Sequence, residues 1–390
     1  MEKDRTMSAI NTDNRQINTR QLAFFAAFVL PVGKLLELPS LLTAYNGGDL
    51  LIAAVLGLFL EFISFAALIL FSKRSQSTPI EALTQRCGKP TARIFCGIYA
   101  LFLLMFATLP LFDLEKFSHS AFSDTSPTFF VFTPFLILSG FICTKGIKAV
   151  GRTADLSPAL FLIPLLGLLA MSVGQADFSR LLPIVEKPLT NSIKAVWKTL
   201  PYFSSGGLLL PLFSGYRYRS GDAKKLLPAF GGGAALTLLF LATFFAVFGL
   251  FGEKEHFAVL KIAQFFPALK FVGRIDLILV YLLAIGLFYY TALPLQLFTD
   301  CFTRCFALKS KLPTAIVLTV ALYPCMLFFN KYSNAIHAFF SQFLPPVFLV
   351  FSLLLPILFL LLFGKKGGGR YQMNNKNTEQ GTDKENNNAG

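Results

Sequence analysis

Three charged side chains stand inside segments that are otherwise apolar. Lys34 and Glu37 lie in PVGKLLELPS, residues 31–40, which follows the run QLAFFAAFVL. Glu61 lies within the next run, LLIAAVLGLFLEFISFAALILF. A charged group inside a membrane segment is costly, and it marks a functional site by default. An ammonium and two carboxylates in such a place suggest the binding of a small polar ligand or the passage of a proton.

The roles of these three groups remain open at the level of the sequence. Lys34 and Glu37 are three residues apart and would share one face of a continuous helix. They either neutralise each other among packed helices, or one of them faces a cavity and senses substrate or a proton. Glu61 either belongs to a charge relay, is protonated, or pairs with Lys34.

The same stretch carries two residues that interrupt a helix. Pro31 lacks the backbone N–H of a regular helix and clashes with the preceding turn, and Gly33 relaxes the backbone further. Backbone groups freed in this way cannot face lipid, and they are tolerated only inside protein or beside a polar cavity. We therefore predict a helix interrupted at Pro31-Val32-Gly33.

A second apolar stretch, TLPYFSSGGLLLPLFSGY at 199–216, is interrupted in a similar way. Half-helices present unpaired N–H groups and positive dipole ends, which suit a carboxylate or a small zwitterion such as an amino acid. The predicted ligand-binding residues are Val32, Gly33, Lys34, Ser204, Ser205, Gly206 and Gly207, with Glu37 and Glu61 as a possible charge relay.

These residues must be positioned by membrane helices. Of the 390 residues, 54% are hydrophobic and 14% are charged, against about 25% charged in soluble domains. The apolar residues form blocks of the roughly 20 residues that a spanning helix needs, without the alternation of a β-barrel. The sequence predicts an all-α polytopic protein with ten spans, at about 21–43, 50–72, 94–114, 128–144, 156–174, 199–216, 228–251, 272–298, 313–330 and 336–363.

The first and sixth of these ten spans are the interrupted ones. This spacing indicates a five-plus-five inverted repeat, in which paired broken helices meet at mid-membrane and bind substrate. We expect a cytoplasmic segment at 1–20, a ten-helix transmembrane domain at 21–363, and a disordered cytoplasmic tail at 364–390. In the longest external loop, SIKAVWKTL is expected to form a short surface helix with Trp197 at the membrane interface.

The distribution of basic residues predicts the orientation. The net charge is +14, and of the 35 Lys and Arg residues 24 fall on one side of the predicted spans and 10 on the other. Positive charge gathers on the cytoplasmic side of membrane proteins, so both termini are expected inside the cell and the charge does not indicate nucleic-acid binding.

Nothing in the sequence favours an enzyme. It contains no Walker loop, no GxSxG and no HExxH, and its six cysteines lack zinc-site spacing. We expect reduced thiols, no metal site and no cofactor.

Several segments, in order, resemble the B-subunits of nutrient germinant receptors of bacterial spores, which belong to the amino acid–polyamine–organocation transporter superfamily. The resemblance covers roughly 17–364. It rests on Gly33 followed by Leu38-Pro39-Ser40, on Gly146, Arg152 and Asp155 before the fifth span, on Leu181-Leu182-Pro183 in the external loop, and on Arg274 and Asp276 at the eighth span.

The resemblance implies a ten-span inverted-repeat fold that binds an amino acid, sugar or nucleoside at the broken helices. It also implies the spore inner membrane and two partners, an A-subunit and a lipoprotein C-subunit.

Two departures from the family pattern fall where the ligand would lie. Relatives often carry an acidic residue where this chain has FSSGG, and they are commonly apolar at Lys34 and Glu37. The identity of the nutrient therefore does not carry over.

Two further hypotheses remain beside a germinant-sensing receptor subunit. A secondary amino-acid transporter would use the same site with alternating access, and a scaffold would retain the cavity without using it. Neighbouring genes for A- and C-subunits would favour the receptor, whereas a solitary gene would favour the transporter.

Overall fold

The protein is described from a computed structural model that places residues 17–121, 128–154, 157–183, 185–255, 257–265, 276–308, 310–331 and 342–364. Within these ranges every regular element is a helix, apart from an isolated parallel bridge between Ile17 and Tyr216. The predicted all-α class is confirmed. The segment before Ile17, the tail after Gly364, and the motif residues Asp155 and Arg274 lie outside the described residues.

The elements follow one another closely along the chain. The α-helices are α2 (Thr19–Phe24), α3 (Leu30–Val32), α4 (Leu38–Asn46), α5 (Leu50–Ser75), α6 (Pro79–Ala121), α7 (Thr128–Lys145), α8 (Ile147–Ala154), α9 (Ser157–Ser172), α10 (Leu189–Lys198), α11 (Gly206–Phe213), α12 (Ala223–Phe248), α13 (Ala258–Phe265), α15 (Asp276–Cys305), α16 (Leu312–Lys331) and α18 (Leu355–Phe363). Short π- or 3-10-helical pieces are η1 (Phe25–Val29), η2 (Gly47–Asp49), η3 (Val173–Gln175), η4 (Phe178–Leu181), η5 (Leu200–Phe203), η6 (Gly249–Lys254) and η7 (Val350–Leu354).

Four helical stretches of the described chain are long and apolar enough to cross a membrane: Leu38–Ser75, Pro79–Thr108, Ala223–Lys254 and Gln342–Phe363. The 26 residues of α5 extend about 39 Å at 1.5 Å per residue, which exceeds the roughly 30 Å of a hydrocarbon core. The chain is therefore a helical membrane protein. The count of ten spans and the inverted repeat stay predictions.

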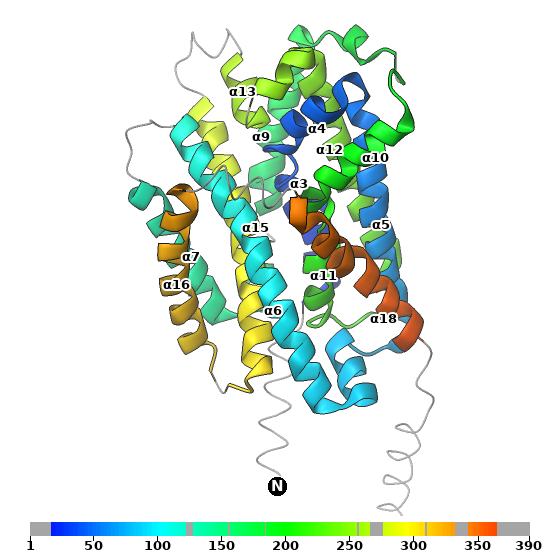
Figure 1. The fold of residues 1–390 in the computed structure, drawn as a ribbon, viewed down its shortest axis with the longest axis vertical. Helices are drawn as coiled ribbons and strands as arrows, with labels where there is room; N and C mark the ends of the chain where they lie inside the picture. Colours follow the sequence, from blue (N-terminus) through cyan, green and yellow to red (C-terminus); the bar gives the residue numbers. More distant parts are fainter. Residues whose placement is uncertain are drawn as a thin grey trace, which may run out of the picture.

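The long helices run side by side along the long axis of the molecule (Figure 1). α6 packs along α15, and α7 packs against both α15 and α16. On the other side, α5 contacts α10, α11, α12 and α18. Their shared interior is rich in phenylalanine; for example, the rings of Phe102 and Phe351 stack with centroids 4.4 Å apart.

The first segment is interrupted, as predicted, although the interruption begins later than expected. α2, η1 and α3 carry the helix through Pro31 and Val32, and the chain leaves it at Gly33 before α4 begins at Leu38. The widened π-turn of η1 accommodates Pro31, which cannot donate to the carbonyl four residues earlier, that of Ala27. That carbonyl lies against Gly233 of α12, where a Cβ would stand 2.8 Å from its oxygen.

The second predicted interruption is also present. η5 ends at Phe203, Ser204 and Ser205 follow outside the α-helix, and α11 begins at Gly206. Pro211 leaves the carbonyl of Gly207 without its helical donor, and the Tyr99 hydroxyl of α6 donates to that oxygen at 2.7 Å. This freed carbonyl is thus satisfied inside the protein, as a membrane interior requires.

Candidate functional site

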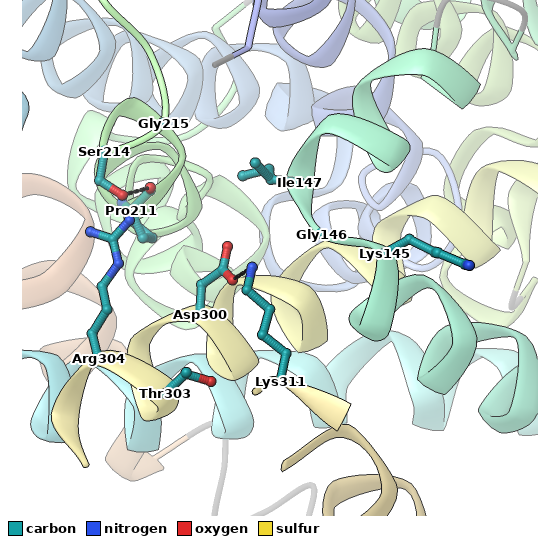
Figure 2. Close-up of a pocket in the computed structure, with 10 residues that line it drawn as sticks. All are labelled: Lys145, Gly146, Ile147, Pro211, Ser214, Gly215, Asp300, Thr303, Arg304 and Lys311. Carbon is teal, nitrogen blue, oxygen red and sulfur yellow. Dashed lines mark hydrogen bonds and ion pairs between the residues drawn. The ribbon is translucent and has the colours of Figure 1, made fainter. Parts of the chain in front are cut away.

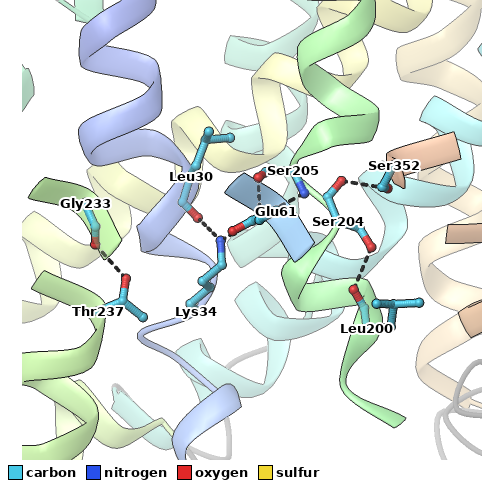
Figure 3. A network of polar contacts seen from close by, with 9 residues as sticks. All are labelled: Leu30, Lys34, Glu61, Leu200, Ser204, Ser205, Gly233, Thr237 and Ser352. Carbon is cyan, nitrogen blue, oxygen red and sulfur yellow. Dashed lines mark hydrogen bonds and ion pairs between the residues drawn. The ribbon is translucent and has the colours of Figure 1, made fainter. Parts of the chain in front are cut away.

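The two breaks meet at one carboxylate (Figure 3). Glu61 lies in α5, and its Oε1 atom accepts a hydrogen bond from Lys34 Nζ at 3.0 Å. The same oxygen accepts from the backbone N–H of Ser205 at 3.0 Å and from the Ser205 hydroxyl. Lys34 follows the first break and Ser205 precedes α11, so Glu61 joins the two interrupted segments.

All three residues are buried, with relative exposures of 2% for Lys34, 2% for Glu61 and 4% for Ser205. The Lys34 ammonium also donates to the Leu30 carbonyl at 3.1 Å, which satisfies a helix end left open by the break. Isolated charges of this kind are costly to bury, and the ion pair is tolerated because each partner is also hydrogen-bonded.

The electrostatics of α11 favour a negative charge at this point. Ser205 is the residue before its first turn, where free N–H groups and the helix dipole create a positive end. The carboxylate of Glu61 takes the place that the carboxylate of a ligand would take at such an end. The anion-binding position of the second break is thus filled by the protein itself.

Glu37 forms a second link between the segments. Tyr202, in η5, donates its hydroxyl hydrogen bond to Glu37 Oε2 at 3.0 Å. The structure therefore corrects the hypothesis of a Lys34–Glu37 pair, since the ion pair of Lys34 is formed with Glu61. Both residues lie in the non-helical stretch between α3 and α4, so their spacing does not place them on one helix face.

Some of the other predicted site residues lie at the second break, and others pack against neighbouring helices. Ser204 accepts a hydrogen bond at its carbonyl from the Ser352 hydroxyl of η7, at 3.0 Å. A Cβ on Gly206 would lie 2.2 Å from Ser64 Oγ, so this glycine permits close contact with α5 and η7.

Val32, Gly33 and Gly207 face neighbouring helices. Val32 packs against Gly286 of α15, and a Cβ on Gly33 would lie 2.4 Å from the ring of Tyr290 in the same helix. Gly207 packs against the Phe102 ring of α6. In this conformation they set the distance between helices.

Three residues of the site were missed by the sequence reasoning: Ser352, Tyr202 and Tyr99. Each bonds to one of the two interrupted segments. The signal for Ser352 is a lone hydroxyl residue in the apolar run FLVFSLLLP. The two tyrosines carried no such signal, because aromatic residues are common throughout the chain.

The space at the breaks is closed. A cavity of about 10 Å³ lies there, lined by residues that include Glu61, Ser204 and Ser352. This is about the space that one water molecule occupies. In this conformation the space is too small for a molecule larger than water.

A larger cavity, of about 100 Å³, lies at the far end of α11 (Figure 2). Its lining combines Ser214 and Gly215, which follow α11, with Asp300 and Arg304 of α15 and with Lys311. Lys311 and Asp300 form an ion pair. α11 is 8 residues long, so about 12 Å of helix separates Ser205 from this polar cavity.

Comparison with known proteins decides the family. The family model described as "Spore germination protein", a spore permease model, matches residues 16–336. The chain belongs to this spore germination protein family. It is also similar to Spore germination protein KB of Bacillus subtilis (strain 168), with 24% identity over 359 residues that cover 90% of this chain and 93% of that protein. The predicted resemblance is confirmed at the level of the family.

Proposed function

We propose that this chain is the nutrient-sensing subunit of a spore germination receptor. It binds a small molecule, such as an amino acid, at mid-membrane between the two interrupted segments. The observation that carries the proposal is the buried link Lys34–Glu61–Ser205, which joins both breaks through one carboxylate. Membership of the spore germination protein family supports it.

The mechanism we propose is an exchange at Glu61. A nutrient carboxylate would compete with Glu61 for the N–H and hydroxyl of Ser205, and a nutrient ammonium would compete with Lys34 for Glu61. Either exchange loosens the contact between the segments, and binding then stabilises the separated arrangement over the closed one. The separated arrangement changes the contacts with the partner subunits, so that nutrient binding and these contacts are linked by a coupling free energy.

The remaining parts of the proposal concern assembly and topology. The ten spans would form the five-plus-five inverted repeat, for which the two breaks five spans apart are the support. Both termini would lie in the cytoplasm, the protein would lie in the spore inner membrane, and an A-subunit and a lipoprotein C-subunit would be its partners.

A germination assay tests this function. Dormant spores with and without the chain are exposed to single nutrients, and loss of refractility and release of dipicolinate are measured. We expect the spores that lack the chain to lose the response to one nutrient and the wild-type gene to restore it. An unchanged response to every nutrient would overturn the proposal.

A secondary amino-acid transporter is the alternative that one observation favours. Glu61 is a buried carboxylate between two interrupted segments, which is the place of a proton-coupling group in many transporters. Uptake of labelled amino acids by growing cells separates the two functions. Reduced uptake with normal germination would indicate the transporter.

A further inference from the structure

The short helix α10 is fixed firmly to the outer half of the first segment. Its inner face buries Ser192, Ala195 and Val196. The amide of Asn46, at the end of α4, donates to the Ser192 hydroxyl at 2.9 Å. Before the helix, the carboxylate of Asp49 accepts from the backbone N–H groups of residues 186 and 187, at 2.9 and 2.7 Å. α10 is therefore a rigid element.

The opposite face of α10 presents two parallel rows of side chains. Ile193 and Trp197 are four residues apart and are 55% and 45% exposed. Lys194 and Lys198 form the second row, one position further along. Residues four apart lie one above the other on a helix. An apolar row and a basic row thus run side by side.

A hollow of about 420 Å³ lies along these rows. Its lining consists of Tyr45, Asn191, Ile193, Lys194, Ala195, Trp197 and Lys198. This lining holds two lysines and no carboxylate. The ammonium of Lys198 lies 4.5 Å from the centroid of the Tyr45 ring, so a cation–π contact holds it at the rim.

The chemistry of the hollow selects an amphiphile with a negative head. A soluble anion would leave the apolar row without a partner, and a neutral hydrocarbon chain would leave the two ammonium groups without one. Tryptophan and lysine side chains suit the boundary between headgroups and acyl chains. We propose that this hollow binds an anionic glycerophospholipid, with its phosphate between Lys194 and Lys198 and an acyl chain along Ile193 and Trp197.

The position of the hollow gives such a lipid a structural consequence. Tyr45 belongs to the outer half of the first interrupted segment, and α10 leads directly into η5 and the second break. A lipid in this hollow contacts elements on the outer side of both breaks. The inference is independent of the nutrient, because it needs only the surface of α4 and α10.

The single tryptophan of the chain provides the test. The full-length protein is reconstituted into nanodiscs of phosphatidylcholine in which one fifth of the lipid is replaced by brominated phosphatidylglycerol or by brominated phosphatidylcholine. Bromine quenches Trp197 fluorescence on contact. We expect the wild type to show roughly fourfold local enrichment of the anionic lipid over its share of the bilayer, where fivefold is the maximum, given the attraction of two lysines near the surface.

Two variants with the same loss of charge complete the experiment. Lys194→Gln/Lys198→Gln is expected to reduce the enrichment to near onefold, while Trp197 stays quenched equally by both lipids. Lys224→Gln/Lys225→Gln removes two exposed lysines at the start of α12 and is expected to leave the enrichment unchanged. Equal quenching by the two lipids in the wild type would overturn the proposal. Absence of quenching by either lipid would also overturn it, because Trp197 would then lie away from the lipid.

Discussion

At the scale of single residues, one carboxylate oxygen carries the contact between two distant parts of the chain. Glu61 Oε1 is bonded to Lys34 and to Ser205, from the first and second breaks. A buried ion pair contributes little stability over an apolar pair of the same volume, but removal of one partner leaves a charge without compensation. The pair therefore determines which two segments contact each other, and it adds little to the stability of the fold.

The first prediction is a coupling between Lys34 and Glu61. Glu61→Gln leaves the buried ammonium of Lys34 without its counter-charge, and we expect a loss of about 3–5 kcal/mol in the free energy of unfolding. Lys34→Met should cost a similar amount, whereas Lys34→Met/Glu61→Leu should cost less than either. Unfolding of the purified protein in detergent measures all three. Additive losses in the double variant would contradict the coupling.

The identity of these residues could be predicted from the sequence, and the pairing of Lys34 with Glu61 was one of the alternatives that the sequence left open. Lys34 and Glu61 were recognisable because charges are rare in apolar runs. The pairing of Lys34 with Glu61, and not with Glu37, depends on where the helix ends, and a spacing rule assumes that it continues. Ser205 was recognisable because it lies at the second break. Its contact with Glu61, 144 positions earlier in the chain, depends on how the helices pack.

At the scale of elements, the first segment and α12 approach each other closely. The carbonyl oxygens of Ala26 and Ala27 face Gly233, where a Cβ would lie 3.0 and 2.8 Å from them. These are backbone atoms and cannot rotate away. A glycine on another helix thus gives room to the turn that accommodates Pro31.

Two glycines of α12 provide a matched prediction. Gly233→Ala should force the first segment away from α12, and we expect a clear fall in thermal stability. Gly231→Ala should be neutral or slightly stabilising, because a Cβ there has no described atom within 4 Å and alanine favours a helix by about 1 kcal/mol over glycine. Melting temperatures of the two variants in the same detergent test this. Equal melting temperatures would contradict the close approach.

The helices could be predicted from the sequence more readily than their interruptions. Apolar runs of 20 or more residues leave few alternatives in a membrane, and the described part of each predicted range contains a helix, with the two breaks as interruptions. The first interruption begins later in the chain than the position of Pro31 suggested, because the π-turn of η1 accommodates Pro31 within the helix. Such a turn depends on the neighbouring helix and has no signature in the sequence.

At the scale of the whole molecule, orientation follows from charge. The side with 24 basic residues is expected in the cytoplasm. Cys87 is exposed and lies on that side, whereas Cys96, Cys143 and Cys301 are buried. Under the predicted topology, this native thiol would lie on the inner face.

Labelling with a membrane-impermeant maleimide tests the orientation. We expect Cys87 to react only after the membrane is permeabilised. The variant Cys87→Ser/Gln175→Cys, with its thiol in the predicted external loop, should react in intact cells. Labelling of Cys87 in intact cells would contradict the predicted topology.

The helix partners across the whole molecule could not be predicted from composition. Phenylalanine occurs on all sides of the spans, with 45 such residues in the chain. No distinct apolar stripe in the sequence therefore indicates that α7 packs against α16 or that α6 packs against α15. The arrangement of the helices was expected from the family resemblance. In the residue pattern, only the two breaks supported that arrangement.

The central claim is that a nutrient binds where Ser205 meets Glu61. The most direct measurement is the nutrient concentration that gives half-maximal germination in spores carrying Ser205→Ala, at equal protein abundance. Ser214→Ala, at the other end of α11, is the matched control. We predict that Ser205→Ala shifts this concentration by about tenfold or more, consistent with one hydrogen bond to a charged group, and that Ser214→Ala leaves it unchanged. Equal dose–response curves for the wild type and both variants would contradict a ligand site at the breaks.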